Sequence, residues 1–302
     1  MTASGTVTPP DRRWFVLANT NAGSADQAAV DRAVAVLAEH APVRLRGTGD
    51  ADELHKALDD AAGHDLVVAG GDGSLHLVVA ALKERGELAE RPLALVPLGT
   101  GNDFARGVGL PLDAGEAAER AAAGTARPMD LLVDDEGGVV VNAVHAGIGA
   151  VAAERAEGMK GRLGALAYPV GALLAAVRGE GWTVRVEVDG AALDLPGAAV
   201  LLVGVGNGPS IGGGTLLCPG ARPDDGRLDV MVSCATGPAA RTAFGAALRN
   251  GTHVERDDVV TAQGTTVRIS GDPLGYDADG ELEEEVADRT YRLEPGAWSL
   301  VS

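Results

Sequence analysis

Two glycine-rich segments carry the residues whose types and spacing point most directly to chemistry. The first is Gly70–Ser74, with the sequence GGDGS, and the second is Gly99–Asp103, with the sequence GTGND. Because glycine has no Cβ, the backbone N–H groups of such loops can approach the oxygens of a phosphate group. A helix that begins in the loop adds the positive end of its dipole. Both segments therefore predict phosphate-binding loops, and a simple turn is the alternative for each.

A carboxylate stands inside the first loop. Asp72 beside a polyphosphate makes chemical sense mainly through a divalent cation, while the plainer alternative is a tight turn with Asp72 as the helix N-cap. Neither loop is a Walker or a Rossmann motif, since no Gly-Lys-Ser/Thr follows the glycines and no G-x-G-x-x-G follows a strand. A third polar segment, Asn19–Ser24, fits helix capping and phosphate binding equally well.

Each of these loops follows a short apolar run that predicts a buried strand. Such runs alternate with helical periodicity through the first part of the chain, which predicts a parallel sheet covered on both faces. Ligands of such sheets bind beyond the carboxyl ends of the strands, so the loops should face one crevice. The predicted strands are Trp14–Ala18, Pro42–Leu45, Leu66–Ala69 and Leu93–Pro97.

The pattern changes near Arg127. Closely spaced strands with turn signals such as Asp189-Gly190 predict an antiparallel sandwich. We therefore expect a nucleotide-binding α/β domain over residues 11–128, which residues 287–302 could complete, and a β-sandwich substrate domain over residues 129–286. The expected strands here are Trp182–Val188, Ala199–Val205, Leu228–Val232, Val267–Ile269 and Tyr291–Leu293, and the expected helices are Leu163–Val177 and Pro238–Leu248.

Composition narrows the classes of partner. The formal net charge of −18 disfavours non-specific binding to nucleic acid or anionic lipid, and 3% aromatic residues disfavour a stacking surface for single strands. Cys218 and Cys234 form neither a metal framework nor a disulfide scaffold, which favours the reducing cytoplasm. No secretory pattern and no apolar run of about 18 residues is present, so membrane contact is expected to be peripheral, at the inner face.

Five segments, taken together, resemble the diacylglycerol-kinase catalytic superfamily, and in particular its small soluble bacterial lipid kinases. The likeness spans nearly the whole chain in the family's order, and the second glycine loop and the long Gly206–Val230 segment are its most specific parts. The matching segments are NTNAG (Asn19–Gly23), VVAGGDGSLHLVV (Val67–Val79), VPLGTGNDFAR (Val96–Arg106), GNGPSIGGGTLLCPGARPDDGRLDV (Gly206–Val230) and DGE (Asp279–Glu281).

The resemblance implies an active site in the cleft between an N-terminal α/β domain and a C-terminal sandwich, with ATP and Mg²⁺ as cofactors. It implies that Asp72 serves phosphoryl transfer through magnesium, that Asp130 joins an acidic network near it, and that Glu281 is the base. The implied nucleotide contacts are Asn19, Thr20, Asn21, Ala22, Gly23, Thr48, Gly70, Gly71, Gly73, Ser74, Gly99, Thr100, Gly101 and Asn102. The implied structural magnesium is held by Asp225 with the backbone carbonyls of Arg222 and Arg227.

Some positions depart from the family pattern. Thr20 replaces a proline, His76-Leu77 replaces an Asn-Glu pair, and Ala150-Val151 stands where an aromatic residue and Asp are usual.

The sequence predicts an ATP-dependent lipid kinase acting on a hydroxyl of a diacylglycerol- or sphingoid-like lipid. The alternatives are a kinase of a soluble hydroxyl such as that of NAD, and a non-catalytic lipid- or nucleotide-binding regulator. Asp279–Glu281 as a plain turn before the acidic run Glu283–Glu285, and Asp224–Gly226 as an ordinary loop, are the structural alternatives.

Overall fold

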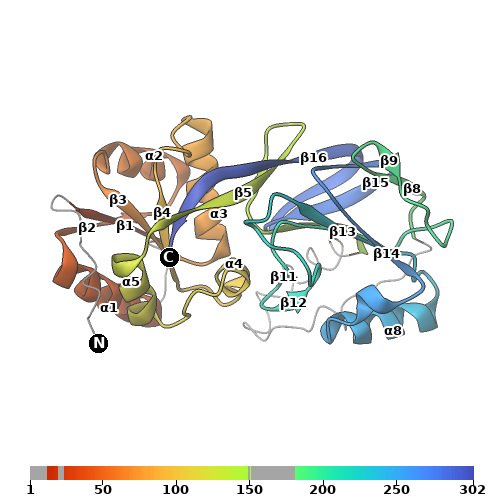
Figure 1. Cartoon of the computed structure of the whole chain (residues 1–302), viewed down its shortest axis with the longest axis horizontal. Helices are drawn as coiled ribbons and strands as arrows, with labels where there is room; N and C mark the ends of the chain where they lie inside the picture. The colour runs from red at the N-terminus through yellow and green to blue at the C-terminus, as the bar shows by residue number, and fades with distance from the viewer. Residues whose placement is uncertain (1–11, 20–23, 149, 151–180) are drawn as a thin grey trace, which may run out of the picture. The chain divides into compact units, whose positions relative to one another are not determined.

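A computed structural model describes residues 12–19, 24–148, 150 and 181–302 (Figure 1). It divides into two compact units, of which unit 1 comprises Met1–Met129 and Gly296–Ser302, and unit 2 comprises Asp130–Pro295. The chain therefore passes from one unit to the other twice, along β5 (Ala126–Asp134) and along β16 (Glu281–Val301). The expected helix at Leu163–Val177 and the loop residues Thr20, Asn21, Ala22 and Gly23 lie outside the described residues.

Unit 1 contains a parallel sheet with the strand order β4-β3-β1-β2. The carboxyl end of β16 adds Leu300 and Val301 beside β4, again in the parallel sense. The strands are β1 (Trp14–Asn19), β2 (Val43–Thr48), β3 (Asp65–Gly70) and β4 (Leu93–Pro97). The four strands predicted from the apolar runs are confirmed, although β2 begins and ends later than the run Pro42–Leu45 suggested.

Helices cover the sheet of unit 1, with α1 and α5 below it and α2 above it in the view of Figure 1. Alternate residues of the strands, such as Trp14 and Val16, pack with the apolar faces of α1 and α5. Asp50 and Asp113 cap α2 and α5 with their side chains, which stabilises the first turn of each helix. The helices are α1 (Ser24–His40), α2 (Ala51–Asp60), α3 (Asp72–Glu84), α4 (Asp103–Gly107) and α5 (Ala114–Ala123).

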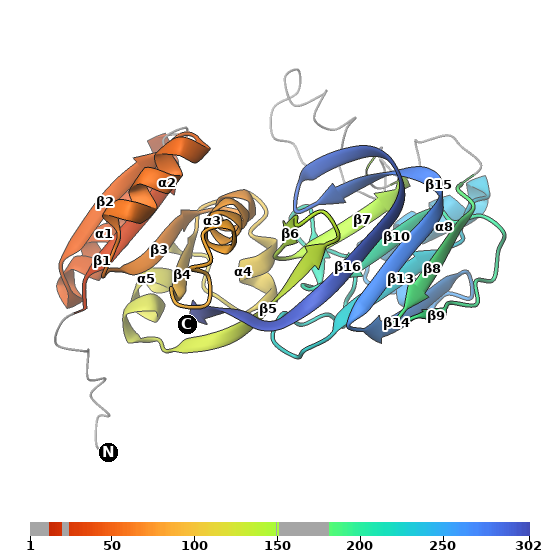
Figure 2. The same cartoon turned by 90° about the horizontal axis from the view of Figure 1, so that it is seen from above.

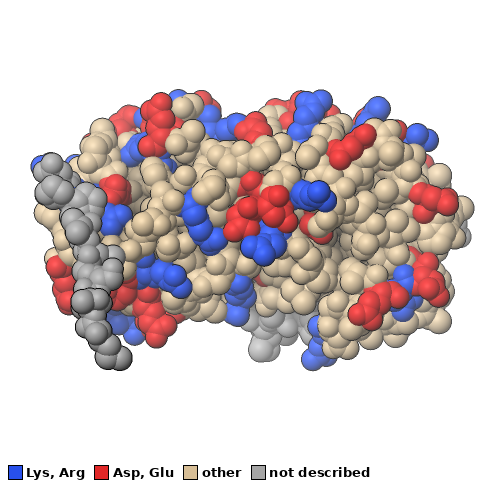
Figure 3. Space-filling view, viewed as in Figure 1, with Lys and Arg blue, Asp and Glu red and all other residues tan. Residues whose placement is uncertain are grey.

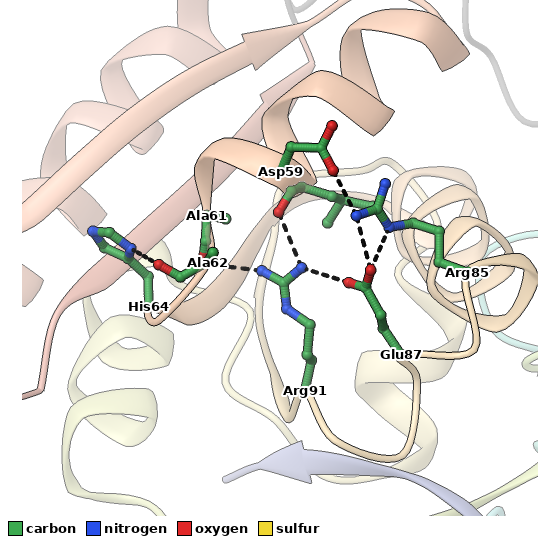
Figure 4. Close-up of polar contacts among 8 residues, drawn as sticks. Asp59, Ala61, Ala62, His64, Arg85, Glu87 and Arg91 are labelled. Atoms are coloured by element: carbon green, nitrogen blue, oxygen red, sulfur yellow. Dashed lines mark hydrogen bonds and ion pairs between the residues drawn. The ribbon is translucent and has the colours of Figure 1, made fainter.

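A polar network ties the end of α2 to the segment after α3 (Figure 4). Arg85 donates to Glu87 at 2.9 Å and to Asp59 at 2.6 Å, and Arg91 donates to Glu87 at 2.9 Å. Arg91 also donates to the carbonyls of Leu58 and Ala61, which satisfies acceptors at the end of α2. The hydrogen bond from Arg85, with a further one from Arg91, holds the pKa of Glu87 below its ordinary value of 4.5, against the opposing effect of burial.

We expect Glu87→Gln to lower the free energy of unfolding by about 1 kcal/mol at pH 7, because it removes the charge that both guanidinium groups contact. Since the pKa of Glu87 is lower in the folded chain than in the unfolded one, this contribution is present above about pH 4.5 and is lost as pH falls through the lowered value. Urea unfolding at pH 7 and pH 3.5 measures the difference. Glu90→Gln, at an exposed position nearby, is the control, and an equal difference at both pH values would contradict the prediction.

Unit 2 contains an antiparallel sheet with the order β14-β13-β10-β7-β15, and β16 pairs with β15 (Figure 2). The helix α8 (Pro238–Arg249) agrees with the predicted one, and Asp189 and Gly190 take positive φ angles in the predicted turn between β8 and β9. The remaining elements are β6 (Val139–Val140), β7 (Ala143–Gly147), β8 (Val184–Val188), β9 (Ala191–Ala192), β10 (Leu202–Gly206), β11 (Ser210–Ile211), β12 (Thr215–Leu216), β13 (Leu228–Ser233), β14 (Val259–Gly264), β15 (Thr266–Ala278) and the 3₁₀ turn η1 (His253–Glu255).

The strand β15 explains how unit 2 becomes a sandwich. Its first half, Val267–Gly271, pairs with β8, whereas its last residues, Tyr276–Ala278, pair with β7. Register shifts occur between Ser270 and Tyr276, where the strand changes partners. Side chains of β7, β8, β10, β13, β15 and β16 meet in one apolar core. The predicted combination of a parallel α/β part and an antiparallel sandwich is thus confirmed, but the predicted short strands at Val267–Ile269 and Tyr291–Leu293 are parts of much longer ones.

Candidate active site

The described residues among those expected to bind a nucleotide lie at the carboxyl ends of four neighbouring strands of unit 1. Asn19 at the end of β1 is paired with Thr48 at the end of β2, and Gly70 at the end of β3 is paired with Pro97 at the end of β4. The strand order reverses between β1 and β3, and that is where open parallel sheets bind ligands. The fold therefore brings Asn19, Thr48 and both glycine loops to one edge of the sheet.

The two glycine loops touch through their backbones. A Cβ on Gly71 would lie 2.9 Å from the Cα of Gly99, and a Cβ on Gly99 would lie 2.7 Å from the Cα of Gly71. The N–H of Leu98 also donates to the carbonyl of Gly70 at 3.0 Å. Side chains at these two positions would push the loops apart, so each glycine is required by the opposite loop.

Asp72 joins the first loop to the helix that follows the second. Its carboxylate accepts from the backbone N–H groups of Asp103 and Phe104, both at 3.0 Å. It does not cap its own helix, because the N-cap of α3 is Gly71 and Asp72 is the first helical residue. The N-cap alternative for Asp72 is therefore wrong: the carboxylate satisfies the start of α4.

Asn102 holds the second loop in shape. Its backbone is left-handed, with φ 52° and ψ 42°, and its side chain both accepts from the N–H of Gly99 at 2.9 Å and donates to the carbonyl of Gly99 at 2.7 Å. The N–H groups of Gly99, Asp103 and Phe104 are thus bonded within the protein. Because these N–H groups already have acceptors in the protein, they are less suited to bind an anion than the N–H groups at the start of α3. The second loop instead supports the first one.

Gly73 differs from the glycines around it. Among the described residues, a Cβ added there would meet nothing within 4 Å, whereas a Cβ on Gly70 would collide with the side chain of Ser74. Gly73 lies in the first turn of α3, whose leading N–H groups have no acceptor within the helix, and Gly71 at the N-cap has no side chain to offer one. The packing of the described chain gives no reason for a glycine at position 73, so the space fits a close ligand such as a phosphate group.

Glu281 follows a rigid turn between β15 and β16 in unit 2. Asp279 and Gly280 form this turn, with φ angles of 52° and 98°. The carboxylate of Asp279 accepts from the N–H groups of Val141, Asn142 and Ala143 at 2.6, 3.0 and 3.0 Å. Glu281 is exposed directly beyond this anchor. The Asp-Gly pair signals the turn in the sequence, but nothing there predicted that Asp279 fastens it to the segment that leads into β7.

The acidic run after Glu281, Glu283–Glu285, lies inside β16. Glu283 pairs with the buried Arg289 of the same strand, and Arg289 also lies within ion-pair distance of Asp134 and Asp135. Only 2% of the Arg289 side chain is exposed. Glu283 pairs with Tyr276 of β15, while Glu284 and Glu285 are exposed, which agrees with the interpretation of a solvated acidic run.

Asp130 begins unit 2 and organises the loop predicted to hold a structural cation. Its N–H donates to the carbonyl of Pro223 at 2.8 Å, and its buried carboxylate accepts from the N–H of Gly226 at 2.7 Å. The buried side chain of Asn207 donates to the carbonyl of Asp130 at 3.1 Å. Asp130 thus fixes both ends of a short loop.

Three residues of that loop were predicted as cation ligands. Asp225 accepts from the N–H of Arg227 at 3.0 Å, and the side chain of Arg222 turns outward toward Asp224. No group of three or more His, Cys, Asp or Glu side chains is arranged to hold a metal among the described residues. A cation here would depend on one carboxylate and the carbonyls of Arg222 and Arg227, a hard oxygen set that suits Mg²⁺ or Ca²⁺.

The departure at His76-Leu77 lies on α3. Leu77 is four residues after Gly73, and 53% of its surface is exposed to solvent. Residues four apart share a face of a helix, so an apolar side chain stands on the same face as Gly73.

Both halves of the chain match known families. Residues 13–133 match a diacylglycerol kinase catalytic domain, and residues 142–302 match a YegS C-terminal NAD kinase beta sandwich-like domain. A protein of Stenotrophomonas maltophilia (strain K279a) named "Probable lipid kinase YegS-like" is 35% identical over 254 residues, covering 82% of this chain and 80% of that protein. One of the same name from Pseudomonas aeruginosa PAO1 is 34% identical over 281 residues, covering 87% and 88%.

Solved structures agree in fold. A crystal structure of a diacylglycerol kinase from Bacillus anthracis str. Sterne has a TM-score of 0.74 at 23% identity and covers 96% of each chain. A second structure from the same organism has a TM-score of 0.79 at 23% identity, covering 100% of this chain and 98% of that one. At this level of identity the likeness supports the fold.

Proposed function

The chain belongs to the diacylglycerol kinase catalytic family, and from this premise we propose that it is an ATP-dependent lipid kinase that phosphorylates a hydroxyl group. The observation that carries the proposal is the open space at Gly73, at the start of α3 and beside the paired glycine loops. This is the kind of site that binds the phosphates of a nucleotide.

The backbone of the first loop binds the phosphates in this proposal. The N–H groups at the start of α3 donate to phosphate oxygens, and the missing side chain at Gly73 lets them come close. Asn19 and Thr48, at the ends of β1 and β2, lie on the same edge of the sheet and extend the site toward the rest of the nucleotide. Gly99 and Asn102 hold the first loop in place from the side.

Asp72 is the residue that suits a magnesium ion carried by the nucleotide. Such an ion, when bound, neutralises the charge that moves between the phosphates during transfer. Both oxygens of the Asp72 carboxylate already accept from N–H groups at the start of α4, so its position relative to the first loop is set before the nucleotide arrives. Asp130 in unit 2 keeps the loop at Pro223–Gly226 in shape, and we assign it this supporting role.

Glu281 is the proposed base. The oxygen of the acceptor hydroxyl forms a bond to the γ-phosphorus, the bond from that phosphorus to the bridging oxygen breaks, ADP leaves, and the hydroxyl proton passes to the carboxylate of Glu281. Anchoring by Asp279 keeps the carboxylate from moving with a loose loop, which favours catalysis by positioning.

The acceptor is a lipid of the diacylglycerol or sphingoid class, which the protein must meet at a membrane surface. Among the described helices, none has the length and apolar character that a membrane crossing requires. On the face in Figure 3, acidic and basic side chains are interspersed. We therefore propose a peripheral and transient contact.

Transfer of label from [γ-³²P]ATP tests the proposed function. The purified protein is incubated with mixed micelles that contain diacylglycerol or a sphingoid base, and in parallel with NAD. Label in the lipid phase supports the proposal, label in NAD supports a soluble-substrate kinase, and label in neither product supports a regulator without catalysis.

The two glycines of the first loop should respond differently to alanine. Gly73→Ala adds a Cβ into open space, so stability should stay the same or rise by up to about 1 kcal/mol, while the KM for ATP rises at least about tenfold. Gly71→Ala forces the loops apart and should lower stability by about 1–3 kcal/mol. Thermal unfolding and steady-state kinetics measure both. Gly237→Ala, another open glycine at a helix start, is the control, and an unchanged KM in Gly73→Ala would remove position 73 from the site.

A further inference from the structure

A buried pair of ionisable side chains lies next to the hairpin that carries Glu281. His145 on β7 and Asp277 on β15 stand directly opposite each other, with the histidine Nε2 3.5 Å from the aspartate Oδ2. Both residues are 8% exposed. Neither belongs to the segments that resemble a kinase motif, and the proposed chemistry uses neither.

The pair points away from the apolar core of the sandwich. Neighbours on each strand, Val144 and Ala146 on β7 and Tyr276 on β15, belong to that core. Because side chains alternate along a strand, His145 and Asp277 face the opposite side of the sheet. On the next strand, Gly204 stands opposite His145, and the side chain of Leu217 fills the space that a Cβ of residue 204 would need.

Asp277 links this pair to the turn. Its Oδ1 accepts from the N–H of Gly280 at 2.8 Å, so the same carboxylate that faces His145 also closes the turn immediately before Glu281. Asp279 bonds the turn to the segment that leads into β7, whereas Asp277 bonds to a backbone N–H group of the turn itself. The direction in which Glu281 leaves the turn depends on both contacts.

The imidazole is suited to hold this carboxylate in one orientation. Burial lowers the pKa of His145, and the nearby carboxylate of Asp277 opposes that effect only in part. A neutral imidazole can donate to the carboxylate without bringing a second buried charge. At 3.5 Å the contact is longer than a typical hydrogen bond. The imidazole therefore limits rotation of the carboxylate mainly by its bulk and by weak electrostatic attraction.

We infer that His145 is a positioning residue for Glu281, acting through the carboxylate of Asp277 and the turn at Gly280. This inference rests on the proposed function of Glu281 as the base. A misplaced base slows proton transfer and leaves the nucleotide loops of unit 1 unchanged. The expected signature is a loss of kcat with an unchanged KM for ATP.

His145→Leu should lower kcat about 5- to 50-fold with the KM for ATP unchanged. In a Glu281→Gln background the same substitution should have almost no further effect on kcat, because His145 acts only through that carboxylate. Asp277→Asn keeps an acceptor for the N–H of Gly280 and should retain more activity than Asp277→Leu. The control is His253→Leu, which removes another buried imidazole of unit 2, one that contacts the carbonyl of Leu217 instead.

Hydrogen exchange provides a readout that does not need activity. The peptide that covers Asp277–Glu283 should exchange faster in His145→Leu than in the parent and His253→Leu proteins. If the parent protein phosphorylates no lipid, the proposed function fails, while faster exchange would still support the contact. If the parent is active and His145→Leu keeps its kcat, or loses activity equally in the Glu281→Gln background, the inference is wrong.

Discussion

Replacing Glu281 by glutamine should lower kcat by about 10²–10⁴-fold while the KM for ATP stays near its original value. The amide cannot take the proton of the acceptor hydroxyl, yet it has the size and shape of the carboxylate. Glu281 is exposed beyond the anchored turn, so the substitution should leave the free energy of unfolding unchanged. Steady-state kinetics with diacylglycerol micelles, together with thermal unfolding, measure both quantities.

Glu284→Gln is the matched control for this prediction. Glu284 lies in the same strand and is also exposed, so it undergoes the same change of charge without a proposed role in catalysis. A kcat within about threefold of the parent value for Glu281→Gln would exclude Glu281 as the base.

Replacing Asp72 by alanine should lower turnover by about 10³-fold or more, and the remaining activity should no longer respond to magnesium concentration. The structure adds a second expected effect. The carboxylate accepts from the N–H groups of Asp103 and Phe104, so alanine leaves two donors without their acceptor and lowers stability by about 1–3 kcal/mol.

The asparagine variant separates these effects. Asp72→Asn keeps one side-chain oxygen as an acceptor but removes the charge, so it should recover much of the stability and little of the activity. Asp52→Asn, in the exposed first turn of α2, controls for the loss of one acidic residue from a helix start. Magnesium-dependent activity in Asp72→Ala would show that the nucleotide site has been assigned to the wrong residues.

The α/β unit could be predicted well because its signals are local. Three strands of unit 1, β1, β3 and β4, are short apolar runs that end at a polar or glycine-rich loop, so the positions of both glycine loops followed from the order of elements. The direct backbone contact of Gly71 with Gly99 could not be predicted, because it depends on how β3 and β4 pair. The same holds for the bond from Asp72 to the start of α4.

The sandwich was harder to predict. The segment Ser270–Leu274 contains Gly271 and Pro273 and therefore looks like the end of a strand, but it is the irregular part of β15 at which the strand changes partners. The strand β7 was missed because its sequence, AVHAG, has neither a clear alternation nor β-branched residues apart from Val144. The pairing of His145 with Asp277 has no signal in the sequence, since the two residues are far apart in the chain.

Residues 296–302 belong to unit 1 but are synthesised after unit 2, which affects when the nucleotide site can form during synthesis. Leu300 and Val301 pair with β4, and the buried Trp298 packs against Phe104, whose N–H is held by Asp72. A ribosome makes all of unit 2 before it reaches these residues. A nascent chain can therefore form the first four strands early, but it cannot complete the support of the second loop until residues 296–302 have left the exit tunnel. We expect ATP affinity to appear only after residues 296–302 have emerged from the tunnel, by which time the sandwich has had time to fold.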